Sequence, residues 1–446
     1  MIAPTVAPTT DARFELSTAH VRAAHRIIPG GAHALAKGDD QYPEDMAPII
    51  VGGSGCRVRD LDDNELIEYG IGLRSVTLGH GDQRVLSAVK TALDSGVNFT
   101  RPHVLERRAA ERLLELFPFA DMVKFGVNGS DATSAAVKVA RAFTGRDRIA
   151  VCADHAMFGT ADWFICTTSM SAGIPRAHHE QTASFRYNDL DSVEAVLNSA
   201  PGEFAAVVLE AETTVPPEPG FFEGLRALCD RHGTLLILDE IITGFRWHER
   251  GAQFVHGITP DLCTLGKGLG NGLPLSALLG RREIMELGGF AAGRDRVFLL
   301  SQTYGAQPWV LAAMLAVIDT YESDAIVSRL HAAGSRLRQG VQTVVSARAL
   351  GPYIQVVGRD CNLVFATRDS SGERSQGFRT LFLQELLRRR ILAPSFVVSA
   401  AHDDDAIDQT VRAVEGALPA YERALEEGLE TVLHGRHVKP TIRRRW

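Results

Sequence analysis

The chain has 446 residues, of which 45% are hydrophobic and 23% are charged, a composition that is ordinary for a globular protein. Its formal net charge of -7 argues against nucleic-acid binding, which requires a basic face. No apolar run approaches the roughly 18 residues of a membrane helix, and residues 1–17 lack the basic start and apolar core of a signal peptide.

The cysteines indicate a reducing compartment. All six are scattered along the chain, and no two of them form a C-x-x-C pair. Several stand in or beside apolar runs, which is typical of small buried residues. Together with the lack of targeting and membrane segments, this predicts a cytoplasmic protein without a metal, nucleic-acid or membrane partner.

The first part of the chain predicts an arm, a helix and a hairpin. Residues 1–15 are rich in Pro, Thr and Ala and are expected to form a mobile arm, and Ser17 can cap a helix over residues 17–26. Residues 55–70 alternate polar and apolar around an Asp-Asp-Asn turn, the pattern of an antiparallel hairpin. Helices are expected next over residues 83–95 and 106–117.

From residue 122 the chain alternates short apolar runs with longer helical spans. This alternation predicts a mostly parallel sheet with helices on both faces, and ligands bind such folds at the carboxyl ends of the strands. The expected strands cover residues 123–127, 149–152, 205–209, 235–238, 262–265 and 297–300, with a turn at 128–131 and helices at 132–143, 190–199 and 221–232. A helix over 309–321 is expected to lead to a second domain containing helices 325–345, 376–389 and 404–427 and a strand at 361–366.

Two residues near the middle of the chain stand out chemically. Asp239 ends one buried run, and Lys267 follows another between two glycines, although only six of the 47 basic residues are lysines. Pyridoxal phosphate is held as a Schiff base by a lysine, while an aspartate pairs with its ring nitrogen. Burial also lowers the pKa of a lysine and frees its amine as a nucleophile. The alternative is a buried strand followed by a glycine-rich loop with a solvated lysine.

Gly129 and Ser130 precede an expected helix whose first turn carries small side chains. Backbone N–H groups and the helix dipole at such a start favour a phosphate, and the Ser130 hydroxyl adds a donor. An ordinary helix cap by Ser or Asp would give the same pattern.

The sequence motifs around Asp239 and Lys267 resemble those of one enzyme family. They read D-E-I-I-T-G-F-R, then G-A-Q-F-V-H-G-I-T-P-D-L-C-T-L-G-K, then G-N-G-L-P-L-S-A-L-L-G-R-R-E-I-M. Over residues 28–417 the chain is similar to class III (fold type I) pyridoxal-phosphate aminotransferases, within them to glutamate-1-semialdehyde aminomutase-like proteins. The resemblance implies an α/β fold, with a large domain around a mostly parallel seven-stranded sheet and a small α+β domain built from both chain ends. It assigns the arm, helix and hairpin to residues 1–70, the large domain to 71–308, and the bridging helix with the rest of the small domain to 309–446.

The resemblance also assigns cofactor contacts. Gly129 and Ser130 match the pair that grips the cofactor phosphate, and Glu210 matches an acid near the ring hydroxyl, although Ala211 stands where the family has Pro. Thr303 matches a threonine that reaches the phosphate of the neighbouring subunit, which implies a homodimer with shared active sites.

One face of the cofactor ring is expected to pack on Ile241, which matches a branched residue of the family. Ile241 also stands two residues beyond Asp239, on the same side of an extended chain. The family covers the other face of the ring with an aromatic residue of a Y-H-G motif, and this motif aligns with Met157-Phe158-Gly159. Either Met157 or Phe158 is expected to cover that face.

Three positions of the expected substrate pocket depart from the aminomutases. The aminomutases bind the substrate carboxylate with an Arg soon after I-P-G-G, whereas this chain has Lys37, which can bind a carboxylate only as a point charge. Leu73 replaces their Trp, with Arg74 beside it, and no gating Glu follows Pro394. As bare sequence, Lys37 and Arg74 could equally be solvated charges.

The departures favour a bulkier or less acidic carbonyl substrate than glutamate-1-semialdehyde, such as a ring ketone or keto-sugar of secondary metabolism. The first hypothesis is an aminotransferase with an amino-acid donor, by resemblance glutamate or glutamine. The second is an intramolecular aminomutase, and the third is a non-catalytic binding protein of this fold. The presence of both Asp239 and Lys267 argues against the third. The glycine-rich G-K-G-L-G-N-G lacks the Lys-Ser/Thr order of a nucleotide loop.

Overall fold

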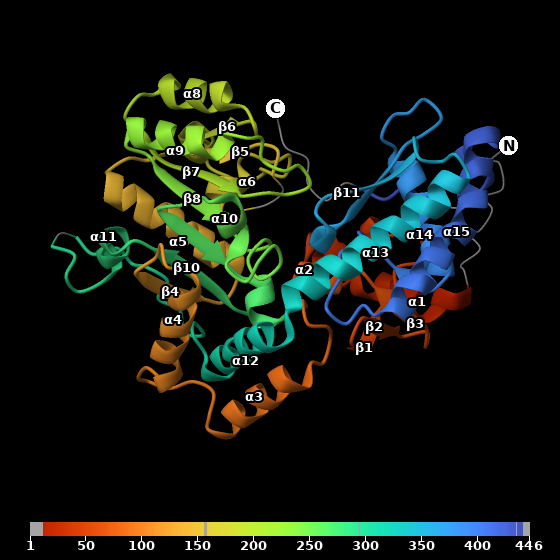
Figure 1. Ribbon diagram of the computed structural model, residues 1–446, viewed down its shortest axis with the longest axis horizontal. Coiled ribbons are helices and arrows are strands. Elements are labelled where there is room, and N and C mark those ends of the chain that lie inside the picture. Colours follow the sequence, from red (N-terminus) through yellow and green to blue (C-terminus); the bar gives the residue numbers. More distant parts are fainter. Residues whose placement is uncertain (1–11, 156–157, 294, 434, 440–446) are drawn as a thin grey trace. The chain divides into compact units, whose positions relative to one another are not determined.

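A computed structural model describes residues 12–155, 158–293, 295–433 and 435–439 (Figure 1). Contacts between residues divide the chain into two compact units. Of the described residues, the central unit comprises 74–77 and 83–327, and the terminal unit comprises 12–73, 78–82 and those from 328 on. None of the described helices is both long and apolar enough to cross a membrane.

A seven-stranded sheet forms the middle of the central unit, in the order β4-β10-β9-β8-β7-β5-β6. β10 runs antiparallel to both of its neighbours, and the other pairs are parallel. Every residue of β7, β8, β9 and β10 is buried, which is typical of strands covered on both faces. The strands are β4 (Met122–Gly126), β5 (Arg148–Cys152), β6 (Thr182–Phe185), β7 (Phe204–Glu210), β8 (Leu235–Asp239), β9 (Leu262–Leu265) and β10 (Ser276–Gly280).

Helices flank this sheet, as the sequence predicts for an α/β fold. α5 packs against five of its strands, and its buried face is rich in alanine, which lets the helix approach closely. α12 packs against α3 and α4. The helices of this unit are α3 (Gln83–Asp94), α4 (Val104–Leu116), α5 (Gly129–Thr144), α6 (Asp162–Ile165), α7 (Arg176–Gln181), α8 (Leu190–Ser199), α9 (Phe221–His232), α10 (Gly251–His256), α11 (Arg282–Met285) and α12 (Pro308–Asp324).

Three local predictions are wrong, and the first is the Ser17 cap, because the helix begins at Glu15 after Phe14 and contains Ser17. Residues 297–300 form no strand, and Phe298 in this apolar run is exposed. The sheet is instead completed by β6 and β10, whose serine, threonine and glycine residues conceal them in the sequence. The turn expected at 128–131 is the first turn of α5, because Asn128 caps the helix by accepting a hydrogen bond from the Asp131 N–H.

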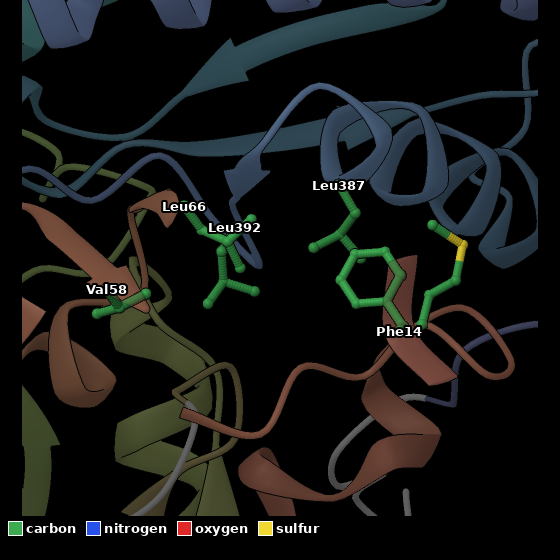
Figure 2. Close-up of a cluster of buried hydrophobic side chains, with 6 residues drawn as sticks. Phe14, Val58, Leu66, Leu387 and Leu392 are labelled. Carbon is green, nitrogen blue, oxygen red and sulfur yellow. The ribbon is translucent and has the colours of Figure 1, made fainter. Parts of the chain in front are cut away.

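Both ends of the chain build the terminal unit. β13 (Ile391–Leu392) pairs in parallel with β3 (Glu65–Glu68), next to β2 (Arg57–Asp60) and β1 (Ile50–Ser54). Figure 2 shows Phe14, Val58 and Leu66 in one buried cluster with Leu387 and Leu392. The other elements of this unit are α1 (Glu15–Ala24), β11 (Ile354–Val357), β12 (Val364–Thr367), α14 (Gln376–Arg388), α15 (Asp404–Glu427) and α13 (Ile326–Ala347) from residue 328.

Candidate active site

Asp239 and Lys267 lie at one edge of the sheet. Asp239 is the last residue of β8, and β8 pairs in parallel with β9, after which Gly266 and Lys267 follow directly. Lys267 has a φ of 45°, in the left-handed region that side chains other than glycine rarely adopt. Such backbone strain is found most often at functional sites.

Burial lowers the pKa of the Lys267 ammonium. Asp239 and Glu210 oppose this lowering, whereas Arg74 and Arg246 add to it. The two acids and three cations therefore act on one another, and we refer to Arg74, Glu210, Asp239, Arg246 and Lys267 as the charged cluster. A neutral Nζ on Lys267 is the form that can act as a nucleophile or accept a proton.

Asp239 is almost completely buried, and burial raises its pKa from 3.8 to about 6. Hydrogen bonds limit the rise, because Oδ1 accepts from the Ile241 N–H at 2.9 Å and from the Thr264 hydroxyl at 3.2 Å. The nearby Lys267 ammonium acts in the same direction. Asp239 is thus mostly ionised at neutral pH and suited to pair with a cation.

Glu210 ends β7 directly beside Asp239, its partner in the parallel ladder. Its backbone N–H donates to Nδ1 of His155 at 3.0 Å. His155 is buried and follows β5 by three residues, so it reaches the same edge of the sheet. Sequence reasoning missed His155, although a polar residue just beyond a buried strand in an α/β fold was a usable signal.

Two arginines complete the charged cluster. Arg246 is fully buried, and its Nη2 donates to the backbone oxygen of Arg74 at 3.2 Å. Burial lowers the pKa of Arg74, the Arg246 charge lowers it further, and Glu210 opposes both. Arg74 ends a left-handed turn, α2 (Ile71–Arg74), and has a φ of 73°. Arg246 was also missed, although it ends the word D-E-I-I-T-G-F-R.

The start of α5 lies against Ile241. A Cβ atom at Gly129 would be 2.6 Å from Cδ1 of Ile241, so glycine is needed for this close approach. Ile241 reaches this position through a turn after β8 and not along an extended chain, which corrects the reason given for it from the sequence. The Ser130 hydroxyl accepts a hydrogen bond from the Thr160 N–H at 3.0 Å.

The remaining predicted residues are placed differently. Met157 lies outside the described residues. Phe158 is buried, and its ring packs edge-on against Phe164 at 5.5 Å between ring centroids. Thr303 is exposed in the central unit, whereas the exposed Lys37 and the half-buried Leu73 belong to the terminal unit and so are not described together with the charged cluster.

Comparisons with known proteins show the family of the chain. Residues 41–414 match the family model of aminotransferase class-III. The chain is 33% identical over 444 residues to glutamate-1-semialdehyde 2,1-aminomutase of Pelotomaculum thermopropionicum, covering 93% of this chain and 99% of the relative. It is 31% identical over 418 residues to the enzyme of the same name from Syntrophobacter fumaroxidans, covering 88% and 95%.

Solved structures share the fold. An omega-transaminase from Sphaerobacter thermophilus has a TM-score of 0.79 and 27% identity, covering 93% of this chain and 98% of that one. A glutamate-1-semialdehyde-aminomutase from Pseudomonas aeruginosa has a TM-score of 0.78 and 22% identity, covering 91% and 96%. The chain therefore belongs to the class III aminotransferases, and it is a fold type I enzyme whose cofactor is pyridoxal 5′-phosphate.

Proposed function

We propose that this enzyme moves an amino group from an amino acid to a carbonyl compound, with Lys267 and Asp239 as its catalytic residues. The observation that supports this most is the buried Lys267 with a lowered pKa, held at the same sheet edge as the buried Asp239. When bound, pyridoxal phosphate supplies an electron sink for the charge left on a carbon that loses its proton.

The residues at this edge fit that cofactor. The described hydrogen bonds of the Asp239 carboxylate use Oδ1, so Oδ2 can pair with the protonated ring nitrogen. Among the described hydrogen bonds, none uses the N–H of Gly129 or Ser130, and these groups at the start of α5 would hold the phosphate. Ile241 lies between Gly129 and Gly266 and would cover one ring face. Glu210 would lie near the ring hydroxyl, and Phe158 or Met157 near the other face.

Lys267 would attach the cofactor covalently through Nζ. Once released, its neutral amine can take the proton from Cα of the substrate and return it to a different carbon. Burial favours this neutral amine, and the ionised Asp239 keeps the positive charge at the ring nitrogen. The two residues thus divide the work between moving the proton and stabilising the charge.

Arg74 is our candidate for binding a carboxylate of the amino-acid donor, which by family resemblance would be glutamate or glutamine. Its planar guanidinium can hold a carboxylate with two parallel hydrogen bonds, and it acts electrostatically on Lys267. Lys37 and Leu73 are proposed to contact the substrate as well. Because Leu73 is smaller than the Trp of the aminomutases, we propose a ring ketone or keto-sugar as the acceptor.

An intramolecular aminomutase is the second candidate. It is favoured by the names of relatives that are 31–33% identical to this chain. Product analysis with and without an added amino donor separates the two reactions, because an aminomutase needs no external donor. Efficient turnover of glutamate-1-semialdehyde without a donor, and none of cyclic ketones, would reject the proposed acceptor class.

The Lys267→Ala variant tests the central proposal. We expect it to lose all turnover and to retain no cofactor on the polypeptide after borohydride reduction, as measured by peptide mass. Lys138→Ala is the matched control, because Lys138 lies on α5 and its hydrogen bond among the described residues is to a backbone oxygen, at 3.4 Å. Full activity of Lys267→Ala would end this mechanism. If Lys267→Ala is inactive as expected, a half-reaction screen of the wild-type enzyme with candidate amines would identify the donor.

A further inference from the structure

The segment from Glu210 to Glu212 lacks the proline that the family resemblance leads one to expect at position 211. A proline would fix φ and stiffen the backbone just after the acid. Ala211 provides no such restraint, yet all three residues are buried. The β7–β8 ladder ends at Glu210, so the backbone beyond it is restrained by other contacts.

Three side chains from three different segments hold it. Nδ1 of His155 accepts the hydrogen bond of the Glu210 N–H at 3.0 Å. The Tyr187 hydroxyl donates to the backbone oxygen of Ala211 at 2.6 Å. His256, the last residue of α10, lies 2.8 Å from a carboxylate oxygen of Glu212.

These three side chains are linked to one another by ring contacts. His155 packs on Tyr187 at 4.6 Å between ring centroids, and Tyr187 packs on Phe221 at 5.1 Å. Phe221 packs on Phe222 at 5.2 Å, and Phe222 packs on His256 at 6.3 Å. We call these five residues the aromatic belt. It is continuous from one end of the segment to the other, so its members restrain one another.

We propose that the aromatic belt positions Glu210 within the charged cluster and takes the place of the missing proline. His155, Tyr187 and His256 are then positioning residues, which act through the backbone of the segment. The inference deepens the proposed function, because it rests on the role given there to Glu210 beside Lys267.

The Ala211 backbone makes the idea testable. Ala211 follows Glu210, the last residue of β7 that pairs with β8, so a proline at this position affects at most the final bond of that ladder. Glu210 is in a β-strand, the conformation that proline imposes on the residue before it. Ala211→Pro should therefore be tolerated and should replace the restraint that the belt supplies.

The experiment measures the pKa of Lys267 in the cofactor-free protein by NMR after 13C-methylation of its lysines. The Glu210 charge raises the pKa of Lys267, with Asp239 acting in the same direction and Arg74 and Arg246 against it. Glu210→Gln removes that charge, so it should give the largest decrease in the pKa of Lys267 among these variants. Tyr187→Phe removes only the hydroxyl that holds Ala211, and we expect a smaller decrease in the same direction, because Glu210 is then held less firmly.

Two further variants complete the test. Tyr187→Phe combined with Ala211→Pro should restore the Lys267 pKa to its wild-type value. Tyr421→Phe is the matched control, because the buried Tyr421 hydroxyl also donates to a backbone oxygen, that of Arg368 at 2.6 Å, in the terminal unit. It should lower the thermal stability at least as much as Tyr187→Phe, because the Tyr421 hydroxyl also accepts from the Arg368 N–H at 3.1 Å, and it should leave the Lys267 pKa unchanged.

The outcomes separate this inference from the proposed function. If Tyr187→Phe leaves the Lys267 pKa unchanged while Glu210→Gln lowers it, the belt does not position Glu210, and the proposed reaction stands. If Ala211→Pro fails to restore the pKa of Lys267 in the Tyr187→Phe variant, the belt does not take the place of the missing proline. If Glu210→Gln has no effect either, Glu210 does not act on Lys267 and the inference is overturned, while the Lys267→Ala result still decides the reaction.

Discussion

At the scale of single residues, Gly129 shows how little space the predicted phosphate site has. Its missing side chain lets the first turn of α5 approach Ile241, whose branched end would otherwise be 2.6 Å from a Cβ atom. Glycine here is thus required by contact and not by backbone conformation, since its φ is not in the left-handed region.

We expect Gly129→Ala to weaken binding of pyridoxal phosphate about tenfold, or about 1.4 kcal/mol, because Ile241 must move from its proposed place beside the cofactor. Fluorescence titration of the cofactor-free protein measures this. Adding Ile241→Val removes the clashing methyl group and should restore binding. Gly351→Ala is the control, because nothing lies within 4 Å of a Cβ atom there. Unchanged affinity of Gly129→Ala would show that the phosphate binds elsewhere.

Asp239 gives a prediction for pH dependence. Its folded pKa, about 6, is above its ordinary value of 3.8, so the stability that its protonated form contributes is full below pH 4 and lost as the pH rises through 6. Asn cannot ionise and can keep the hydrogen bonds from Ile241 and Thr264. Between pH 5 and 8, the cofactor-free Asp239→Asn variant should therefore gain about 1–2 kcal/mol of unfolding free energy relative to wild type.

Urea unfolding at both pH values measures this difference. The pKa of Lys267 falls further without its carboxylate partner, which shifts the relative stability in the same direction. Asp261→Asn is a contrast, because Asp261 is paired with Arg226 at 2.9 Å and Arg281 at 2.8 Å. That variant should lose about 3 kcal/mol at both pH values. Parallel pH curves for wild type and Asp239→Asn would contradict the raised pKa.

At the scale of elements, the site depends on how α5 begins. Asn128 and Asp131 form a capping box, in which each side chain accepts the backbone N–H of the other. This arrangement leaves the N–H groups of Gly129 and Ser130 for a ligand. The cap is therefore expected to matter for cofactor binding as well as for stability.

We expect Asn128→Ala to lower the free energy of unfolding by about 1 kcal/mol and also to weaken cofactor binding. Asp403→Ala removes the equivalent cap of α15, where the side chain accepts from the Ala406 N–H at 2.9 Å. The two variants should lose similar stability in chemical denaturation, but only the first should lose cofactor affinity. Equal cofactor affinity in both would show that the cap serves the fold alone.

Element prediction succeeded where burial gave a clear pattern. The buried runs of β7, β8 and β9 were found because continuous apolar residues bounded by polar ones are typical of central parallel strands. It failed at residues 297–300, where an apolar run is partly exposed, and at β10, which follows a glycine-rich turn. Local residue type does not report whether a neighbouring strand is available for pairing.

At the scale of the whole molecule, the central unit exposes several large apolar side chains. Phe290 is 95% exposed, Phe298 70% and Tyr304 68%, and all three lie near the exposed Thr303 in the sequence. Exposed apolar groups of this size mark interaction surfaces when they gather. They support the homodimer that the family resemblance implies, in which Thr303 would reach the partner's cofactor phosphate.

Mixed dimers test this shared site. We expect Thr303→Ala to reduce activity and Lys267→Ala to abolish it. Refolding the two variants together should restore activity to one site of each mixed dimer, because that site combines an intact Lys267 with the partner's intact Thr303. Each variant refolded alone is the control. No gain on mixing, or a monomer in light scattering, would contradict the shared site.

The sequence by itself determined the α/β class, the family, the cofactor and the two residues proposed for catalysis. These features could be predicted because each depends on residues that are close together in the sequence. A buried strand followed by an acid, or by a Gly-Lys-Gly motif, is encoded within a few neighbouring residues. Only the tertiary structure brought Arg246 and His155 to the same sheet edge and linked Glu210 to rings from three distant segments. Those contacts join residues that are tens of positions apart in the sequence. Which of these residues meet is decided by the pairing order of the strands, and no local sequence pattern encodes that order.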